Sequence, residues 1–449
     1  MTVIELGLVT DGGDRPPSAR SRRPIGRAEL RRVLVAAVAI VCVLTVTGSA
    51  RPEPHGPARL WSTPFREGAD TFMVAGGGAY VLSQSGGTRL TAHDLRTGVV
   101  RWSNPVPDNA DVLGLIQAGV LLLPAAHTTV RFKDPDGLEV YREFSRDTIA
   151  VDAVTGRQLW RRPGELAAAT GDRALLTEWN DDGSRVRAMQ MVRVADGGTV
   201  WSRRAADLET WVTDGRFQIR ADRLVTASAK GDVEVFDLAD GSPVSAATLP
   251  WGRPPAQDSR ATALTVEGHR LYVEHSDQER TTVTAYDTET LRRLWHIEPR
   301  SPGGAFGCGP VLCLNGPDGT AGYDRDTGEL RWRIPGSANA FPLVTGQLLV
   351  DDDESGARHH LIDAATGRRL ADLGTAAPVW NLGTTASPYL LARTREPAGL
   401  MSVSRFDERS GEVLLLGAMP PVIEYGCQSE GTLLACMTQD SRLAVTDVG

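Results

Sequence analysis

The chain has 449 residues, of which 41% are hydrophobic, and it contains 47 Gly and 27 Pro. This balance favours many short strands joined by tight turns over a helical protein. The first 50 residues hold seven Arg and four acids, a net charge of +3, whereas the rest holds 41 basic and 52 acidic residues, a net charge of −11. Because a large acidic surface repels phosphate backbones, nucleic acid is not expected as a partner.

The N-terminal 60 residues divide into three segments. Residues 1–32 are rich in Arg and are expected to form a cytoplasmic tail, because positive charge stays on the inner side of a membrane. Residues 33–49 are uncharged and almost wholly apolar, and they predict one transmembrane helix at the short end of the usual ~17–25 residues. Residues 50–60 contain three prolines and predict a stiff spacer.

The apolar segment has two interpretations. Gly48-Ser49-Ala50 could be a cleavage site, which would make the segment a signal peptide. The 32-residue leader favours an uncleaved signal anchor instead. We therefore expect a single-pass protein of the cell membrane with its N-terminus in the cytoplasm and residues 61–449 outside it.

One phrase recurs through residues 61–449 at a spacing of about 40 residues, which is typical of propellers and other repeat proteins. It reads apolar-x-Asp-x-x-Thr-Gly-x-x-x-Trp. Its three full copies contain Asp94, Gly98 and Trp102; Asp152, Gly156 and Trp160; and Asp324, Gly328 and Trp332. The Asp and Thr of such a phrase hydrogen-bond a turn, and Gly takes the positive-φ position. The Trp on the departing strand is expected to pack against the neighbouring unit.

Five further copies are degraded. They centre on Arg193, Asp237, Asp287, Asp363 and Asp407, and Ser245, Ala371 and Leu415 replace three of the tryptophans. We expect Leu415 to fill part of the space of an indole, which the two smaller side chains cannot do. Half-copies at Trp61 and at residues 445–447 indicate that the first strand completes the last unit, which closes a ring without an exposed edge.

The fold class that follows is all-β, a β-propeller of four-stranded antiparallel blades preceded by one transmembrane helix. Runs such as Tyr80–Leu82, Gly119–Leu123, Arg270–Glu274 and Gln347–Val350 predict inner strands. Eight phrases and one split unit would give nine blades. Because propellers usually have ~4–8, we expect eight, with seven to nine possible and one unit irregular. The polar insertion Arg131–Arg146 is expected to loop out from one face.

The phrase resembles the repeat of the pyrroloquinoline-quinone-like (PQQ-like) β-propeller family, over roughly residues 61–449. That family contains quinone-dependent alcohol dehydrogenases and also non-enzymatic bacterial scaffolds such as the lipoprotein BamB. The resemblance implies, for the dehydrogenases, an adjacent Cys-Cys disulfide, a calcium site and a catalytic Asp. No adjacent cysteines occur in this sequence. The resemblance therefore transfers no catalytic, cofactor-binding or metal-binding residue to this chain.

Four cysteines follow the membrane segment: Cys308, Cys313, Cys427 and Cys436. An even number outside the cytoplasm predicts disulfides, with three possible pairings. A turn at Gly431-Thr432 would place Cys427 directly opposite Cys436, and a turn centred on Pro310-Val311 would place Cys308 opposite Cys313. Free buried thiols are the alternative.

One acidic run and one pair of adjacent histidines suggest that the chain could bind a metal ion. The run 351–354 is Asp-Asp-Asp-Glu, but it lacks the alternating spacing of a calcium loop and favours a solvated turn. His359 and His360 are adjacent, so on a strand they point to opposite faces and cannot easily bind one ion. The sequence therefore predicts no metal site.

Two functions from different classes remain. The leading hypothesis is a membrane-anchored, extracytoplasmic propeller that acts as a non-enzymatic binding or scaffold protein for a protein, peptide or cell-envelope ligand. The alternative is a PQQ- or metal-dependent oxidoreductase with degenerate cofactor motifs. The leading hypothesis requires no cofactor.

Overall fold

A computed structural model of the chain describes residues 56–449, apart from short gaps. The gaps are residues 85–86, 107–109, 111, 134–138, 206–207, 215–221, 252–261, 277–280, 300–303, 317–318, 337–338, 344–345, 352–357, 380–388 and 408. The predicted cytoplasmic tail, transmembrane helix and first part of the spacer lie outside the described residues. Within the described part of the chain, no helix is long and apolar enough to cross a membrane.

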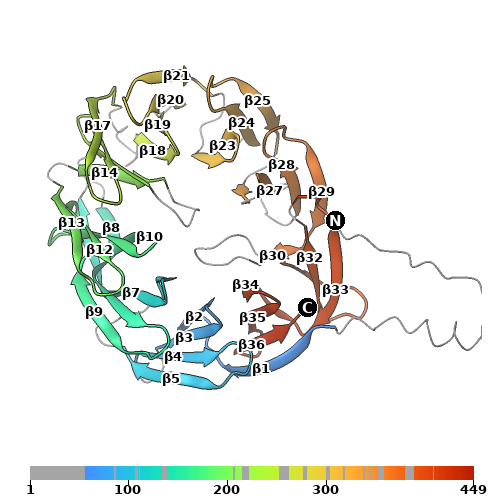
Figure 1. Cartoon of the computed structure of the whole chain (residues 1–449). Coiled ribbons are helices and arrows are strands. Elements are labelled where there is room, and N and C mark those ends of the chain that lie inside the picture. Colours follow the sequence, from blue (N-terminus) through green and yellow to red (C-terminus); the bar gives the residue numbers. More distant parts are fainter. Residues whose placement is uncertain are drawn as a thin grey trace, which may run out of the picture. The chain divides into compact units, whose positions relative to one another are not determined.

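The described residues form nine four-stranded antiparallel sheets arranged around a ring (Figure 1). In chain order the blades are β2-β3-β4-β5, β6-β7-β8-β9, β10-β11-β12-β13, β14-β15-β16-β17, β18-β19-β20-β21, β22-β23-β24-β25, β26-β27-β28-β29, β30-β31-β32-β33 and β34-β35-β36-β1. We number them blades 1 to 9. The all-β propeller of four-stranded blades is confirmed, but the expected count of eight blades is wrong.

The strand bounds follow the sequence closely. Blade 1 contains β2 (Asp70–Ala75), β3 (Gly78–Ser83), β4 (Arg89–Asp94) and β5 (Val100–Pro105). Blade 2 contains β6 (Leu115–Gln117), β7 (Val120–Lys133), β8 (Glu139–Asp152) and β9 (Gln158–Pro163). Blade 3 contains β10 (Glu165–Thr170), β11 (Arg173–Trp179), β12 (Val186–Arg193) and β13 (Thr199–Arg204). Blade 4 contains β14 (Leu208–Thr213), β15 (Arg223–Ser228), β16 (Asp232–Asp237) and β17 (Pro243–Thr248). Blade 5 contains β18 (Thr262–Glu267), β19 (Arg270–Ser276), β20 (Thr281–Asp287) and β21 (Arg293–Ile297).

The remaining blades are similar. Blade 6 contains β22 (Ala305–Cys308), β23 (Val311–Gly316), β24 (Gly319–Asp324) and β25 (Leu330–Ile334). Blade 7 contains β26 (Ala340–Pro342), β27 (Gln347–Asp351), β28 (His359–Asp363) and β29 (Arg369–Gly374). Blade 8 contains β30 (Ala377–Pro378), β31 (Tyr389–Arg393), β32 (Met401–Phe406) and β33 (Val413–Met419). Blade 9 contains β34 (Val422–Glu430), β35 (Leu433–Thr438), β36 (Arg442–Asp447) and β1 (Ala58–Pro64).

The ring closes through strand pairing between the two ends of the described chain. β1 pairs antiparallel with β36, from Ala58 opposite Asp447 to Pro64 opposite Arg442. Figure 1 shows the two ends of the colour scale meeting in this blade. The half-copies at Trp61 and at residues 445–447 are therefore parts of one sheet, as the sequence predicted.

In each of blades 1 to 8, the third strand turns into the fourth through the same pair of backbone hydrogen bonds. In blade 1 the N–H of Gly98 donates to the carbonyl of Asp94 at 2.8 Å, and the N–H of Asp94 donates to the carbonyl of Val99 at 2.8 Å. The same pair recurs from Asp152, Arg193, Asp237, Asp287, Asp324, Asp363 and Asp407. The degraded copies thus form complete blades, because the turn is held by the backbone and survives the loss of individual side chains.

The core lies between neighbouring blades. One cluster joins Tyr80 and Leu90 of blade 1 to Leu121 and Ile149 of blade 2, and similar clusters fill the other junctions. The predicted inner strands fall in β3, β7, β19 and β27, each the second strand of its blade. These inner strands are buried on both faces, as β3 and β27 show, because each face packs against a neighbouring blade.

The insertion Arg131–Arg146 differs from the loop that we expected. β7 and β8 continue their ladder through it, with His127 opposite Ser145 and Lys133 opposite Glu139. Phe144 is buried, and the guanidinium of Arg142 lies 4.7 Å from the ring centroid of Trp179 in blade 3. The insertion is a lengthened hairpin held against the next blade by an aromatic contact.

Both predicted disulfides are present, but one has a different register. Cys427 and Cys436 are direct partners on β34 and β35. Cys308 pairs across the ladder with Val311 while Cys313 pairs with Phe306, so the bonded cysteines are diagonal neighbours with Cα atoms 5.9 Å apart. The turn is Gly309-Pro310, one residue earlier than expected, because Gly309 takes the positive φ of 79° that a two-residue hairpin loop needs.

The Cys427–Cys436 disulfide closes the loop within the blade that seals the ring. Replacing both cysteines by alanine in the full-length chain should lower the free energy of unfolding by about 2–3 kcal/mol, because a short covalent loop no longer restricts the unfolded state. Chemical denaturation followed by tryptophan fluorescence measures this change. The control Cys42→Ala removes a thiol outside both pairs and should leave the midpoint unchanged; an equal loss in the control would contradict the assignment.

Candidate functional site

The tryptophans of the phrase lie on outer strands and contact the turn of the next blade. A Cβ built on Gly156 would lie 2.4 Å from the Trp102 ring, and one on Gly367 would lie 2.7 Å from that of Trp332. The Trp102 Nε1–H donates to the Ala153 carbonyl at 3.1 Å. Each of these positions therefore requires glycine for two reasons: its φ is positive, and the neighbouring indole leaves no room for a Cβ atom.

Six of the nine junctions have this indole, and the donated hydrogen bond is the same in each. The pairs are Trp61 with Leu95, Trp102 with Ala153, Trp160 with Val194, Trp201 with Leu238, Trp295 with Arg325 and Trp332 with Ala364. Gly98, Gly156 and Gly328 lie beneath Trp61, Trp102 and Trp295 respectively. The repeat residues that the sequence singled out thus act in pairs across junctions.

Three junctions depart from the pattern. Between blades 4 and 5, the Ser245 hydroxyl donates to the Thr288 carbonyl at 2.6 Å, which keeps the hydrogen bond without the bulk of an indole. Between blades 7 and 8, Ala371 lies against Gly411. Between blades 8 and 9, Leu415 is 64% exposed. The expectation that Leu415 fills an indole's space is therefore wrong.

Two variants at equivalent positions of the phrase can measure how much the indole contributes to stability. Trp332→Ala should destabilise the full-length chain by about 3–5 kcal/mol, because a buried aromatic side chain and its hydrogen bond are lost. Leu415→Ala at the equivalent position of blade 8 should change stability by no more than about 0.5 kcal/mol, since the side chain is exposed. Denaturation midpoints test both. Similar losses in the two variants would show that the indole does not hold the junction.

The phrase carboxylates are fixed by hydrogen bonds within their turns. Asp94 accepts from the Arg101 guanidinium at 2.8 Å and from the Thr97 N–H at 2.9 Å, and these bonds hold its pKa well below the usual range. The Thr155 N–H, followed by its hydroxyl, lowers the pKa of Asp152. The Arg331 guanidinium does so for Asp324. These three aspartates are structural parts of turns.

This arrangement predicts acid sensitivity with a definite sign. A carboxyl with a lowered folded pKa contributes stability above its unfolded pKa of about 3.9, and this contribution disappears as the pH falls through the folded value. Asp152→Asn should therefore make the unfolding temperature fall less steeply below about pH 4. Burial raises the pKa of Asp214, so Asp214→Asn should change the slope in the opposite direction. Thermal unfolding from pH 2 to 6 measures how each substitution changes the pH dependence of the unfolding temperature. Changes in the same direction for the two variants would contradict the assignment.

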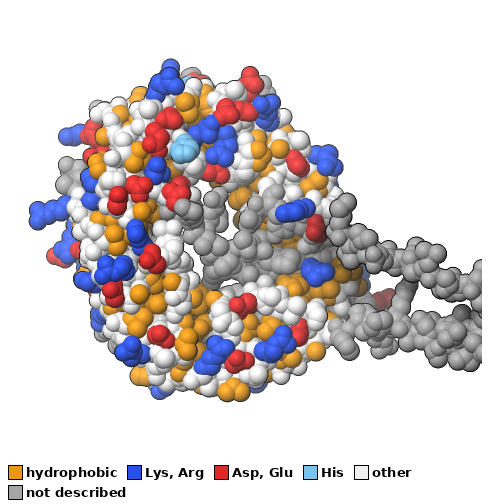
Figure 2. All heavy atoms as spheres, viewed as in Figure 1, with side chains coloured by type: hydrophobic (Ala, Val, Ile, Leu, Met, Phe, Trp, Pro, Cys, Tyr) orange, Lys and Arg blue, Asp and Glu red, His pale blue; other side chains and the backbone are white. Residues whose placement is uncertain are grey.

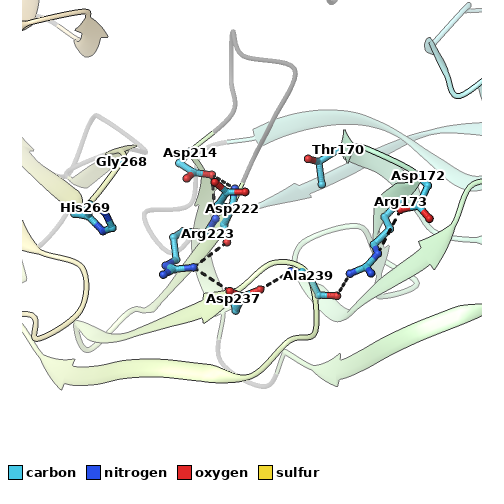
Figure 3. Close-up of a pocket in the computed structure, with 10 residues that line it drawn as sticks. All are labelled: Thr170, Asp172, Arg173, Asp214, Asp222, Arg223, Asp237, Ala239, Gly268 and His269. Carbon is cyan, nitrogen blue, oxygen red and sulfur yellow. Dashed lines mark hydrogen bonds and ion pairs between the residues drawn. The ribbon is translucent and has the colours of Figure 1, made fainter.

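A hollow of about 530 Å³ lies on the face of the ring that carries the phrase turns, across blades 3, 4 and 5 (Figure 3). Its lining residues come from the loops between first and second strands and from the phrase turn of blade 4. They are Thr170, Asp172, Arg173, Asp214, Asp222, Arg223, Asp237, Ala239, Gly268 and His269. We call this hollow the three-blade pocket.

Hydrogen bonds pre-form the walls of the three-blade pocket. Asp214 Oδ1 accepts from the backbone N–H groups of Asp222 at 2.7 Å and Arg223 at 3.0 Å. Arg223 donates to Asp237 Oδ2 at 3.0 Å and to Glu289 Oε1 at 2.9 Å, so its guanidinium joins blade 4 to blade 5. The pocket thus lies beside the junction where Ser245 replaces the indole.

The lining carries four carboxylates and two guanidinium groups, and both guanidinium groups are engaged. Arg173 donates to the Ala239 carbonyl across the junction with blade 4 and lies 3.6 Å from Asp172. Figure 2 shows that acidic and basic side chains are interspersed over the visible face of the molecule. Because the cations are already paired and the carboxylates outnumber them, the pocket is suited to a cationic or hydrogen-bond-donating group of a ligand.

Sequence reasoning did not find this pocket. Among its lining residues only Asp237 and Ala239 lie in a copy of the phrase, and Ala239 occupies one of its variable positions. Asp172 and Asp222 directly precede β11 and β15, and polar residues before an inner strand are a weak signal that any turn shares. The pocket arises because three such turns meet, which the spacing of the repeats does not disclose.

Asp351, the first residue of the acidic run, ends β27, and the adjacent histidines begin β28 of blade 7, whereas residues 352–354 lie outside the described part of the chain. His359 Nδ1 lies 2.8 Å from Asp351 Oδ1, and Asn339 Nδ2 donates to Asp351 Oδ2 at 3.2 Å. The side chains of both His359 and Asp351 are 6% exposed. Asp351 is therefore buried as the last residue of β27, and our expectation of a solvated turn is wrong at this position. Within the described residues, no group of three or more His, Cys, Asp or Glu side chains is placed to hold a metal ion.

The cysteines do not fit a quinone site of the dehydrogenase kind. All four are buried, and each pair joins two strands of one hairpin. These cysteines therefore cannot form the disulfide between adjacent cysteines that the resemblance implies for the quinone-dependent dehydrogenases.

The sequence matches the family model described as outer membrane protein assembly factor BamB, over residues 45–176 and 182–314, which is more than half of the chain. The chain belongs to this BamB-like propeller family. The repeat that resembled the PQQ-like propellers is thus shown to be one of theirs. No curated protein matches the sequence at a significant level.

Solved structures resemble this BamB-like chain in fold. BamB from Moraxella catarrhalis is 16% identical, with 87% of this chain and 99% of that chain covered and a TM-score of 0.44. The computationally designed protein Ika8 is 11% identical, with coverages of 86% and 99% and a TM-score of 0.42. The quinohemoprotein alcohol dehydrogenase ADHIIG from Pseudomonas putida HK5 is 15% identical, with coverages of 62% and 61% and a TM-score of 0.38. At these identities the resemblance is one of fold.

Proposed function

We propose that this BamB-like chain is a membrane-anchored, extracytoplasmic binding protein that holds a partner protein or cell-envelope ligand through the loops of its turn face, without catalysis. The observation that carries the proposal is the three-blade pocket. Its walls come from three neighbouring blades, and hydrogen bonds hold the Asp214 carboxylate and the Arg223 guanidinium. Side chains that are already held in place lower the entropy cost of binding a ligand.

The family description supports a protein as the partner. The matching model is described as an outer membrane protein assembly factor, and assembly of proteins requires contact with other polypeptides. A carboxylate-rich pocket fits a Lys or Arg side chain presented on a partner's loop. We therefore place the contact of highest specificity at Asp172, Asp214 and Asp222.

Two features of the chain support the proposed location. Two buried disulfides indicate an oxidising compartment, because such bonds are rare in the cytosol. The Arg-rich residues 1–32 and the apolar residues 33–49 suit a single-pass anchor with its N-terminus inside. Both support a propeller that is displayed outside the membrane.

Site-specific photo-crosslinking in intact cells that make the full-length chain tests this proposal. A photoreactive residue at His269, which is 77% exposed on the pocket rim, should give a discrete crosslinked partner. The control is Val154, which is 74% exposed in the phrase turn of blade 2 on the same face. Asp222→Asn should weaken the crosslink from position 269, because it removes a lining charge.

Three outcomes would contradict the proposal. Identical crosslinks from positions 269 and 154 would show that the pocket is not the contact. Failure of a membrane-impermeant maleimide to label His269→Cys on whole cells would place the propeller inside. Reduction of a dye by alcohols or sugars after addition of the quinone and calcium would favour the oxidoreductase instead.

A further inference from the structure

We propose that the outer strand of blade 8 is a membrane-docking edge, which lies against the lipid headgroups and places the ring with its rim on the bilayer. The inference rests on the anchoring proposed above and specifies which surface of the propeller faces the membrane. We define the β33 strip as Val413, Leu414 and Leu415. These three consecutive residues are 43%, 52% and 64% exposed.

The composition of β33 sets it apart from the strand that most resembles it. Val99 and Val100, the residue before β5 and its first residue, are exposed, and they are followed at once by Arg101, whose guanidinium pairs with Asp94. β33 reads VLLLGAM and carries no charge over its seven residues. A continuous uncharged edge is normally avoided on a free outer strand, because it invites association.

The exposure of Leu415 follows from the register of β33. Leu415 lies opposite Ser404 and Gly417 lies opposite Val403, so Leu416 is the extra residue, and Leu416 packs against the core cluster between blades 8 and 9. Blade 9 is completed by two chain ends, β36 and β1, in place of a phrase turn. The register of β33 thus leaves an apolar strip on the rim at this junction.

The spacer meets the propeller at this same strand. A Cβ built on Gly417 would lie 2.4 Å from Pro57 Cδ and 3.5 Å from Gly56 Cα. Only residues 50–55 separate Gly56 from the apolar segment 33–49. Six extended residues span at most about 20 Å, so an anchor at 33–49 holds the β33 strip close to the bilayer surface.

The charges around the strip suit anionic headgroups. Arg405 pairs across the ladder with Leu414 and is exposed. Arg59 at the start of β1 is exposed as well, beside Leu60, which is 39% exposed. The turn that precedes the strip adds the exposed acids Asp407 and Glu412 and the exposed Arg409. Leucines flanked by arginines are the combination that settles in a bilayer interface.

Docking by the rim has a consequence for the proposed function. β33 lies on the circumference of the ring, and the blades of the three-blade pocket lie across the ring from it (Figure 1). Both faces of the ring then stay accessible from the aqueous side. A partner could therefore reach the pocket while the protein remains on its membrane.

The test uses the full-length chain with Cys42→Ser, reconstituted in vesicles that contain anionic lipid. An environment-sensitive fluorophore is attached at Leu414→Cys, and in a matched variant at Leu330→Cys, which is 51% exposed on the outer strand of blade 6. We expect a blue-shifted emission at position 414 and a loss of fluorescence with headgroup-proximal spin-labelled lipid. The label at position 330 should keep its aqueous spectrum and its intensity.

The outcomes separate this inference from the anchoring on which it rests. If alkaline extraction leaves the chain in the vesicles but position 414 is quenched no more than position 330, the docking edge is wrong and the anchor stands. If the chain is extracted, the anchor is wrong and the docking edge falls with it. Oxidative crosslinking of Leu414→Cys between two chains, without quenching by lipid, would assign the strip to a second copy and overturn the proposal.

Discussion

The structure depends on one contact, in which an outer strand of a blade packs against the phrase turn of the next blade. The turn is closed by two backbone hydrogen bonds, such as those that link Asp94 to Gly98 and Val99. It presents a glycine face and one free carbonyl to the neighbouring indole. The Trp332 ring lies on Gly367 and its Nε1–H donates to the Ala364 carbonyl at 2.8 Å. Apolar burial and a directional bond thus fix the angle between blades, and repetition of that angle closes the ring.

The junctions without an indole are stabilised in other ways. Between blades 4 and 5, Ser245 retains the hydrogen bond and the Arg223–Glu289 ion pair joins the two sheets. Between blades 7 and 8, a cluster that includes Leu361 and Phe406 fills the space beside Ala371. Between blades 8 and 9, an extended cluster contains both Cys427 and Cys436. Each substitution exchanges one local contact for another, which is why the ring keeps its geometry.

These substituted junctions are also where the surface gains features that the repeat itself lacks. The three-blade pocket borders the Ser245 junction, where polar groups replace a large flat side chain. The β33 strip lies at the Leu415 junction, where the ring is closed by chain ends. A regular array specifies architecture through consistency, so local departures are the natural places for binding surfaces. The two proposals about function both come from such departures.

The sequence predicted the parts of the fold that depend on short-range chemistry. The phrase turns, the closing strand at Trp61 and the pairing of Cys427 with Cys436 all follow from spacing within one hairpin or one sheet. The blade count was wrong because the usual range of ~4–8 blades was preferred over the nine units that the phrases indicated. Leu291 occupies the glycine position with a φ of 50°, yet its N–H donates to the Asp287 carbonyl like any other copy. The register at Cys308 was wrong because glycine conformation decides the turn.

The candidate site could not be predicted in the same way, because its residues are far apart in sequence and none of them is distinctive alone. Asp172, Asp214 and His269 meet only because three consecutive blades are held at a fixed angle. A change in that angle would separate them, even if every local turn were preserved. The indole contact between blades 3 and 4, with Trp201 on Gly241, therefore supports the site although it does not line it. In this propeller the position of the pocket is a property of the junctions, and the chemistry of the pocket is a property of the loops.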